Sequence, residues 1–394
     1  MKASQYVQNQ RTKIGFVSTN SIAQGEQVGI LWKALFETYR MKIHFAHQTF
    51  KWTNEAPGVA AVHCIIIGFA AFDVEKKLLF EYKDIVEEPS VTVVKNITPY
   101  LTDGNDIWIP TRAKPICDVP KMVYGSKPVD DGNFFFNDEE KADFLKKEPA
   151  AATWFRPILS SREYLNGKNR WCLWLDGITE NELNTLPLVR ERVEAVRTFR
   201  LASPKKQTQE AAKIPHLFME IRQPRKAFII IPQHSSENRK YIPFGFFDSK
   251  NIVHNSCTAL PDAPHFIFGI ISSEMHMAWV KYVCGRIKSD YRYSNTLVYN
   301  NFPFPMHTTP AQKSAVEVAA QAVLNVRNAH APPLNQPQLY DPAKMPTDLL
   351  QAHWALDRAV DGCYGLQKAF ASEAKRVAWL FRLYGELVKD FTKK

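Results

Sequence analysis

Between Lys13 and His47 the sequence reads KIGFVSTNSIAQGEQVGILWKALFETYRMKIHFAH, and its apolar residues change spacing twice. Lys13–Ser18 and Lys42–His47 are short apolar runs typical of strands. Gln24–Tyr39 lies between them and carries apolar residues at helical spacing, which predicts a helix. A further strand is expected over Val59–Phe72. Strand, helix, strand, strand is the order found in the closing part of a doubly wound α/β sheet.

The cofactor loop of such a sheet does not occur in this sequence. In doubly wound folds a glycine-rich loop follows the first strand, so that a helix amino terminus can approach the ligand. Neither Gly-x-Gly-x-x-Gly nor Gly-x-x-x-x-Gly-Lys is found among the 394 residues. The strand at Lys13–Ser18 would also lack an inner parallel neighbour, so we expect it to form an exposed edge. These features predict a truncated fold whose opening part is missing.

The composition is that of an ordinary globular protein with a basic balance. A length of 394 residues suits two or three domains. The net charge of +10 suits a polyanionic partner, although a merely basic soluble protein explains the charge equally well. No apolar run approaches the about 20 residues that span a bilayer. The six cysteines form no Cys-x-x-Cys pair, so we expect no metal site and a reducing, cytoplasmic location.

The character of the sequence changes twice further along the chain. From about residue 85 to 310, short β-rich pieces such as Trp171–Leu175 and Ala227–Pro232 alternate with prolines and loops, which indicates an α+β region. One helix is expected there, over Ser272–Ile287. Three more helices are expected after Pro310, over Ala311–Ala329, Thr347–Tyr364 and Ser372–Lys389.

The run Gly285–Ser294, which reads GRIKSDYRYS, combines charged heads with aromatic rings at the end of the expected helix. Lys288 can donate to the two major-groove acceptors of guanine, and Asp290 can accept from the amino group of the paired cytosine. Candidate contacts to the DNA backbone are Arg286, Arg292 and Tyr293. Taken alone, however, a cluster of charges is more simply explained as a set of surface salt bridges.

Phe50 and Trp52 follow directly after a predicted strand end, where loop residues of an open sheet line the ligand crevice. An aromatic ring there could stack on a nucleobase rotated out of the duplex, or it could simply pack in the core. Asn301 begins the run Asn-Phe-Pro-Phe, which only superficially matches the Asn-Pro-Pro-aromatic loop of adenine methyltransferases. Phe302 stands where a proline is needed, so we expect no catalytic residue there or elsewhere in the chain.

Longer ordered matches point to one family. They cover Phe16–Ile30, Asn166–Leu175, Arg239–Phe246, Met275–Pro305 and Leu339–Gly365. Through these stretches the chain resembles the carboxy-terminal part of type IIL restriction–modification enzymes, in which one polypeptide carries a nuclease, a gamma-class adenine methyltransferase and a target recognition domain.

The resemblance implies the α/β remnant of a Rossmann-like methyltransferase sheet (residues 1–80), then an α+β target recognition domain (81–310) and a helical carboxy-terminal segment (311–394). It also implies that Lys288 with Asp290 reads one base pair and that Phe50 and Trp52 stack on the flipped adenine. The partner would be double-stranded DNA.

The cofactor S-adenosylmethionine would serve the complete enzyme, and none is expected for this chain alone, because the family's nuclease, cofactor loop and Asn-Pro-Pro-aromatic motif precede the matching part. We therefore expect the chain alone to be inactive. Two alternatives stay open at this point: a stand-alone specificity subunit that pairs with a separately encoded catalytic half, and an RNA-binding factor.

Overall fold

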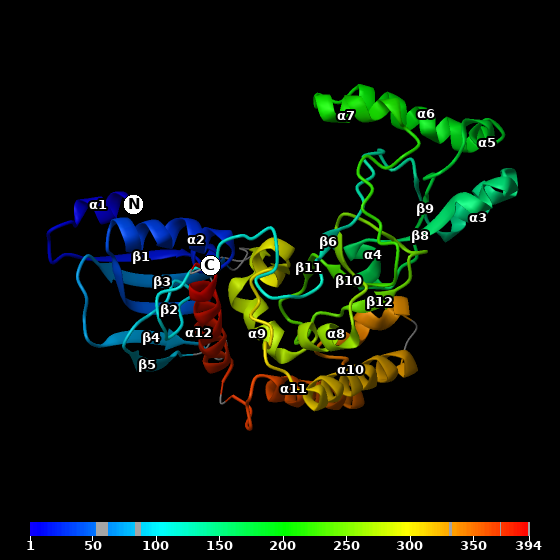
Figure 1. The fold of residues 1–394 in the computed structure, drawn as a ribbon. Coiled ribbons are helices and arrows are strands. Elements are labelled where there is room, and N and C mark those ends of the chain that lie inside the picture. Colours follow the sequence, from blue (N-terminus) through cyan, green and yellow to red (C-terminus); the bar gives the residue numbers. More distant parts are fainter. Residues whose placement is uncertain (53–61, 83–87, 331–332, 371, 393–394) are drawn as a thin grey trace. The chain divides into compact units, whose positions relative to one another are not determined.

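The computed structural model describes residues 1–52, 62–82, 88–330, 333–370 and 372–392 (Figure 1). Its internal contacts group the chain into two compact units. Unit 1 comprises Met1–Val119, Ser273–Lys313 and Asp357–Lys394, and unit 2 comprises Pro120–Ser272 and Ser314–Leu356. Segments far apart in the sequence therefore share a unit, and this division differs from three consecutive domains.

Unit 1 is built on a mixed five-stranded sheet with the strand order β1-β3-β2-β4-β5. The strands are β1 (Lys13–Thr19), β2 (Lys42–Trp52), β3 (Val62–Ala70), β4 (Lys77–Glu81) and β5 (Ser90–Val94). Strands β2 and β4 are parallel, and the other neighbouring pairs are antiparallel. The three strands predicted in this region are confirmed, and β2 extends beyond the expected end at His47. Residues 59–61 of the last one lie outside the described residues.

The helix predicted over Gln24–Tyr39 is confirmed with a later start and a changed ending. After α1 (Lys2–Tyr6) and β1, the helix α2 spans Glu26–Lys33 and continues as a π-helical turn over Ala34–Thr38. Gly25 precedes it with a φ of +68°, which glycine adopts without strain. Helix α2 packs on one face of the sheet through Trp32, whose ring centroid lies 6.5 Å from that of Phe69 (Figure 1).

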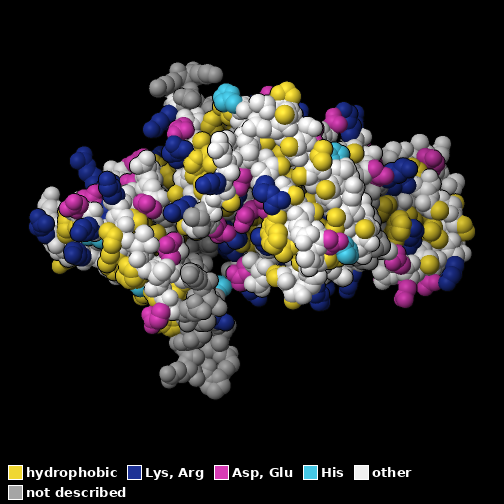
Figure 2. Space-filling view, turned by 90° about the horizontal axis from the view of Figure 1, so that it is seen from below, with side chains coloured by type: hydrophobic (Ala, Val, Ile, Leu, Met, Phe, Trp, Pro, Cys, Tyr) yellow, Lys and Arg dark blue, Asp and Glu magenta, His cyan; other side chains and the backbone are white. Residues whose placement is uncertain are grey.

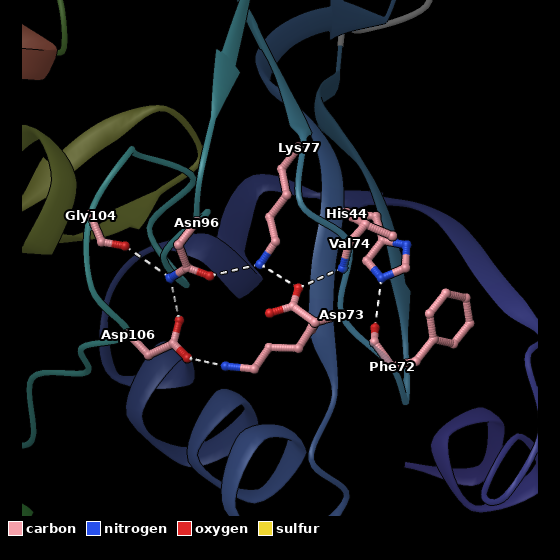
Figure 3. A network of polar contacts seen from close by, with 9 residues as sticks. His44, Phe72, Asp73, Val74, Lys77, Asn96, Gly104 and Asp106 are labelled. Atoms are coloured by element: carbon pink, nitrogen blue, oxygen red, sulfur yellow. Dashed lines mark hydrogen bonds and ion pairs between the residues drawn. The ribbon is translucent and has the colours of Figure 1, made fainter.

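A polar network closes the end of the sheet where β2 and β4 begin (Figure 3). Lys77 is fully buried, and its Nζ lies 2.9 Å from both Asn96 Oδ1 and Asp73 Oδ1. Asn96 Nδ2 in turn donates to Asp106 Oδ1 at 2.7 Å, and Asp106 receives Lys42 Nζ at 2.9 Å. The network thereby holds the loop after β5 against the sheet, and it satisfies a cation that would be costly to bury without partners.

Replacing Asn96 with alanine should lower the free energy of unfolding of unit 1 by about 2–4 kcal/mol, because buried Lys77 loses one of its two partners. The carbonyl of Gly104 loses its donor as well. Chemical denaturation followed by tryptophan fluorescence measures the change. The control is Thr12→Ala in the same unit: Thr12 is exposed and its hydroxyl hydrogen-bonds Gln10 at the surface, so this substitution should cost clearly less. Equal denaturation midpoints for Asn96→Ala and the parent protein would contradict the assigned role.

Unit 2 has an α+β fold with two four-stranded sheets, ordered β12-β10-β14-β6 and β13-β8-β9-β7. The strands are β6 (Val123–Tyr124), β7 (Phe135–Phe136), β8 (Phe155–Leu159), β9 (Trp171–Leu173), β10 (Phe228–Pro232), β12 (Gly245–Phe247), β13 (Ile252–Val253) and β14 (Cys257–Pro261). The predicted strands at Trp171–Leu175 and Ala227–Pro232 correspond to β9 and β10. All five residues of β10 are buried, which suits a central strand.

Further helices belong to unit 2 and to the carboxy-terminal region. They include α3 (Asp138–Lys147), α4 (Ser161–Asn166), α5 (Glu180–Asn184), α6 (Pro187–Leu201), α7 (Lys206–Glu210), α8 (His265–Ile271), α10 (Pro310–His330), α11 (Thr347–Cys363) and α12 (Glu373–Thr392). The three helices predicted after Pro310 are thus confirmed as α10, α11 and α12. No helix in the described part of the chain is long and apolar enough to cross a membrane.

Arg200, at the end of α6, is a fully buried cation that organises the loops of unit 2. Its guanidinium donates to five backbone carbonyls, those of Pro128, Val129, Ala211, Ile214 and Leu217. Val129 has a φ of +53°, which is strained for a β-branched residue. Two of the five hydrogen bonds therefore hold a strained loop in place.

Candidate nucleic-acid interface

The segment that carries Lys288 and Asp290 is a β-hairpin, so the expectation that both residues stand at a helix end is wrong. Helix α9 spans Glu274–Val283 and stops before Gly285. The backbone N–H of Gly25 donates to Val283 O at 3.2 Å, so one terminal carbonyl of the helix is satisfied by a distant segment. Strands β15 (Gly285–Ile287) and β16 (Asp290–Arg292) then pair in antiparallel fashion.

The hairpin turn presents the two predicted base readers. Ile287 pairs with Asp290, so Lys288 and Ser289 form a two-residue turn. Lys288 has a φ of +56°, a value that hairpin turns usually assign to glycine, asparagine or aspartate. This backbone costs an ordinary residue about 1–2 kcal/mol. The side chains of Lys288 and Asp290 are both exposed, whereas Tyr291 between Asp290 and Arg292 is buried.

Arg286 holds this turn from inside the hairpin. Its Nη1 donates to Ser289 O at 2.8 Å, and its Nη2 donates to Lys281 O at 3.2 Å. The guanidinium carbon also lies 3.9 Å from the centre of the Tyr291 ring. The Arg286 side chain therefore connects the hairpin turn to the carboxy-terminal end of α9, and it stacks on the buried Tyr291 of β16.

The other two predicted backbone contacts lie in different surroundings. Arg292, at the end of β16, is exposed. Tyr293 is buried, and its hydroxyl lies 2.9 Å from Nε2 of His276. Burial raises the pKa of Tyr293 well above its ordinary value, so the phenol stays neutral. The structure thus presents Arg292 at the surface and keeps the Tyr293 side chain in the core.

Phe50 and Trp52 belong to a larger aromatic cluster, which we define as His47, Phe50, Trp52, Phe80 and Tyr82. The ring of His47 stacks on Phe80 with centroids 4.0 Å apart and planes at 4°. Phe50 stacks on Tyr82 at 5.4 Å and lies 6.0 Å from Trp52, which is 46% exposed. A hydrogen bond of 2.8 Å joins His47 Nδ1 and the Tyr82 hydroxyl.

A β-bulge creates this aromatic cluster. His47 and Phe50, three residues apart, would face opposite sides of a regular strand, but β2 shifts register against β3 between them. Their rings consequently lie 6.5 Å apart. The cluster lies at the carboxyl ends of the parallel strands β2 and β4, the edge where open α/β sheets place ligands. Sequence reasoning missed His47 and Tyr82, because spacing alone does not reveal a bulge.

Asn301 has a structural role. Its amide nitrogen donates to the carbonyls of Pro110, Thr296 and Leu297, and its oxygen accepts from Arg112 Nε and the Tyr384 hydroxyl. The side chain is fully buried and its hydrogen-bonding capacity is used by the fold. In the described ranges of the chain, no group of three or more His, Cys, Asp or Glu residues could hold a metal ion.

Charge alone does not locate an interface on the face drawn in Figure 2. Lys and Arg side chains are interspersed there with Asp, Glu and apolar side chains. The net charge of +10 is therefore not gathered into one field on that face. The case for nucleic acid consequently depends on individual side chains such as Lys288 and Asp290.

Comparisons with known proteins place the whole chain. Three family models match: the MmeI DNA-methyltransferase domain over residues 1–81, the MmeI target recognition domain over 103–306 and the MmeI C-terminal domain over 308–392. The Bacillus subtilis (strain 168) protein called DNA methyltransferase A is 39% identical over 387 residues, which cover 98% of this chain and 43% of that protein.

A solved structure agrees with the family models. It is described as the type IIL restriction–modification enzyme MmeI in complex with DNA, and it is 46% identical with a TM-score of 0.89. The match covers 98% of this chain and 51% of that one, so the chain spans about half the length of the relatives it matches. This chain therefore belongs to the MmeI-like family of type IIL restriction–modification enzymes, of which it carries the end of the methyltransferase domain, the target recognition domain and the C-terminal domain.

Proposed function

We propose that this chain reads a double-stranded DNA sequence as the recognition part of an S-adenosylmethionine-dependent, adenine-specific DNA methyltransferase of a restriction–modification system. The observation that carries the proposal is the β15–β16 hairpin, which exposes Lys288 and Asp290 on a fixed turn. The relative with 46% identity is described in complex with DNA, which supports the same partner here.

Each exposed group has a defined task in this proposal. Lys288 donates to O6 and N7 of a guanine in the major groove, and Asp290 accepts from N4 of the paired cytosine, so together they specify G·C. Arg292 contacts a phosphate and fixes the register of the protein on the duplex. Arg286 could serve as a second phosphate contact, but its guanidinium is already engaged within the hairpin.

The aromatic cluster receives the target adenine after that base leaves the helix. Unstacking a base costs a few kcal/mol, and stacking on an aromatic ring returns part of that cost. Phe50 and the half-exposed Trp52 supply the rings, with Tyr82 behind Phe50. Methyl transfer then needs a donor site and an amide to hold the target amine. These 394 residues contain neither a glycine-rich cofactor loop nor an Asn-Pro-Pro-aromatic motif.

The test is a binding selection on random duplexes, followed by affinity measurements at fixed salt and a methyl-transfer assay with labelled S-adenosylmethionine. We expect one preferred duplex sequence, bound about 10³-fold or more tightly than random DNA, and no methyl incorporation. Equal binding to all duplexes would overturn the proposal. A preference for single-stranded RNA would favour the RNA-binding alternative, and methylation without added protein would show that the chain is catalytic by itself.

A second candidate function is a specificity subunit that pairs with a separate catalytic polypeptide, and the sheet of unit 1 favours it. The face opposite α2 shows an apolar band that follows the strand register through Phe45, Leu78 and Val93. Val93 is 60% exposed, and Val91 on the same face is 54% exposed. The sheets of doubly wound α/β folds normally have both faces buried. An exposed apolar patch on such a sheet therefore marks an interaction site.

Co-expression with a polypeptide carrying the amino-terminal half of the Bacillus subtilis relative would test this candidate. Stable co-purification that is lost in Val91→Lys and Val93→Lys would support it. Val318→Lys is a matched control because Val318 is similarly exposed on α10. Failure of the two polypeptides to associate would count against the specificity subunit and would leave the DNA-reading proposal standing.

Replacing Phe50 with alanine should weaken binding to a duplex whose target adenine is unpaired by about 1–3 kcal/mol, the value of one base–aromatic stack. The fluorescence of 2-aminopurine at that position reports on stacking and should rise, because the ring that quenches it is gone. Phe16→Ala removes another exposed phenylalanine of the same sheet and should change neither reading. If Phe50→Ala and the parent protein show the same affinity and the same fluorescence, Phe50 does not stack on the target base.

A further inference from the structure

We infer that Arg286 is a positioning residue for base reading: it fixes the Lys288 turn from inside the protein and does not act as a phosphate clamp. The inference rests on the proposed DNA-reading function of Lys288 and Asp290. It assigns to Arg286 a task different from that of the exposed Arg292 on the partner strand of the same hairpin.

The first argument is the backbone of the turn. Lys288 has a φ of +56°, a conformation that a residue with a Cβ atom adopts only when its surroundings hold it there. The carbonyl oxygen of the next residue, Ser289, accepts a hydrogen bond of 2.8 Å from Arg286 Nη1. This hydrogen bond restrains the peptide between Ser289 and Asp290, which closes the two-residue turn, and so it restrains the turn from which the Lys288 side chain leaves.

The second argument is the contact that the other Nη atom of Arg286 makes with helix α9. Its Nη2 donates to Lys281 O at 3.2 Å, in the last turn of α9. The Lys281 side chain is itself paired with Glu373 of α12. Arg286 therefore connects the hairpin turn to a helix that is itself linked to α12 by an ion pair.

The third argument is the face of the guanidinium. It lies 3.9 Å from the centre of the Tyr291 ring, and Tyr291 is only 2% exposed. Both Nη atoms and one face of the planar group are thus occupied within the protein. Turning the guanidinium towards a phosphate would pull it away from the Tyr291 ring and from the two carbonyls, whereas Arg292 is exposed on β16.

The two roles predict different responses to salt. Each phosphate contact contributes about 0.9 to the slope of log K against log salt concentration. Loss of a positioning residue leaves that slope unchanged and instead reduces discrimination at the base pair that Lys288 and Asp290 read.

The experiment uses the full chain and compares Arg286→Met, Arg286→Lys and Arg292→Met. Affinities are measured between 50 and 200 mM salt, the range where phosphate contacts dominate the change. The ligands are the preferred duplex and one in which the G·C pair in question is replaced by A·T. For Arg286→Met we expect discrimination between the duplexes to fall about tenfold or more, with an unchanged slope. Arg292→Met should lower the slope by about 0.9 and leave discrimination intact.

Arg286→Lys separates geometry from charge, because lysine keeps the charge but not the planar fork. It should resemble Arg286→Met. Full discrimination by Arg286→Lys, or a reduced slope for Arg286→Met, would overturn the inference. Thermal unfolding shows whether each variant is folded, and if Arg286→Met is not, Arg286→Lys decides alone. If the parent protein itself shows no sequence preference, the proposed function fails; if it does and both Arg286 variants keep it, only this inference fails.

Discussion

Exchanging Lys288 for glutamate together with Asp290 for arginine should change the preferred base pair at one position of the recognised site from G·C to C·G. The glutamate would accept from the cytosine amino group, and the arginine would donate to the two acceptors of guanine on the other strand. A good bidentate contact is worth about 1–3 kcal/mol of discrimination, which corresponds to roughly 5- to 150-fold in relative affinity. Both side chains are exposed, so the exchange should leave the fold intact.

Selection from a randomised duplex library, repeated with parent and variant, measures this change directly. The control exchanges another exposed pair of opposite charge, Lys226→Glu with Asp262→Arg in unit 2, which alters the same charges in residues that are not part of the hairpin. The control should select the parental sequence. An unaltered base preference in the Lys288 and Asp290 exchange would count against the assignment of these residues as readers.

Replacing Arg200 with methionine should lower the free energy of unfolding of unit 2 by about 3–5 kcal/mol. Five backbone carbonyls lose a hydrogen bond from the guanidinium. Those of Pro128, Ala211 and Ile214 keep a backbone N–H donor, so the cost falls mainly on the carbonyls of Val129 and Leu217, at about 1–3 kcal/mol for each buried unsatisfied group. The strained loop at Val129 also loses the hydrogen bond that holds it. Methionine keeps the apolar stem of the side chain, so the effect comes from the lost hydrogen bonds.

Urea denaturation of the whole chain gives the midpoint for each variant. Arg197→Met serves as control, because Arg197 lies on the same helix with its side chain 42% exposed and paired with Glu194. Surface ion pairs contribute at most about 1 kcal/mol, so this variant should unfold close to the parent. If the two variants unfold at the same urea concentration, the hydrogen bonds from Arg200 to the five carbonyls do not stabilise unit 2.

The regular parts of the fold could be predicted from local sequence. The strand at Lys13–Ser18 and the helices after Pro310 follow from apolar spacing and from capping or breaking residues, which act within a few positions. The hairpin at Gly285 could not be predicted in this way. There the carbonyl of Val283, the last residue of the helix, accepts from the N–H of Gly25, a contact across more than 250 positions in sequence.

The candidate site shows the same limit. Lys288 and Asp290 could be proposed as base readers from their chemistry and by resemblance, because base-reading side chains have to be polar and exposed. His47, Tyr82 and the inward role of Arg286 depend on a register shift in β2 and on a turn with positive φ. Both are properties of backbone geometry that the pattern of residue types does not encode.

Unit 1 combines segments from both ends of the chain, so it can be completed only after its last segment has been translated. Unit 2 receives its last segment at Leu356, whereas unit 1 still awaits Asp357–Lys394. Within that segment, Phe381 of α12 packs on Trp279 of α9, and Glu373 pairs with Lys281. A ribosome that has not yet released these residues therefore holds a hairpin whose supporting helix lacks its partner. Under the proposed function, the hairpin would therefore gain its full support only after α12 has been made.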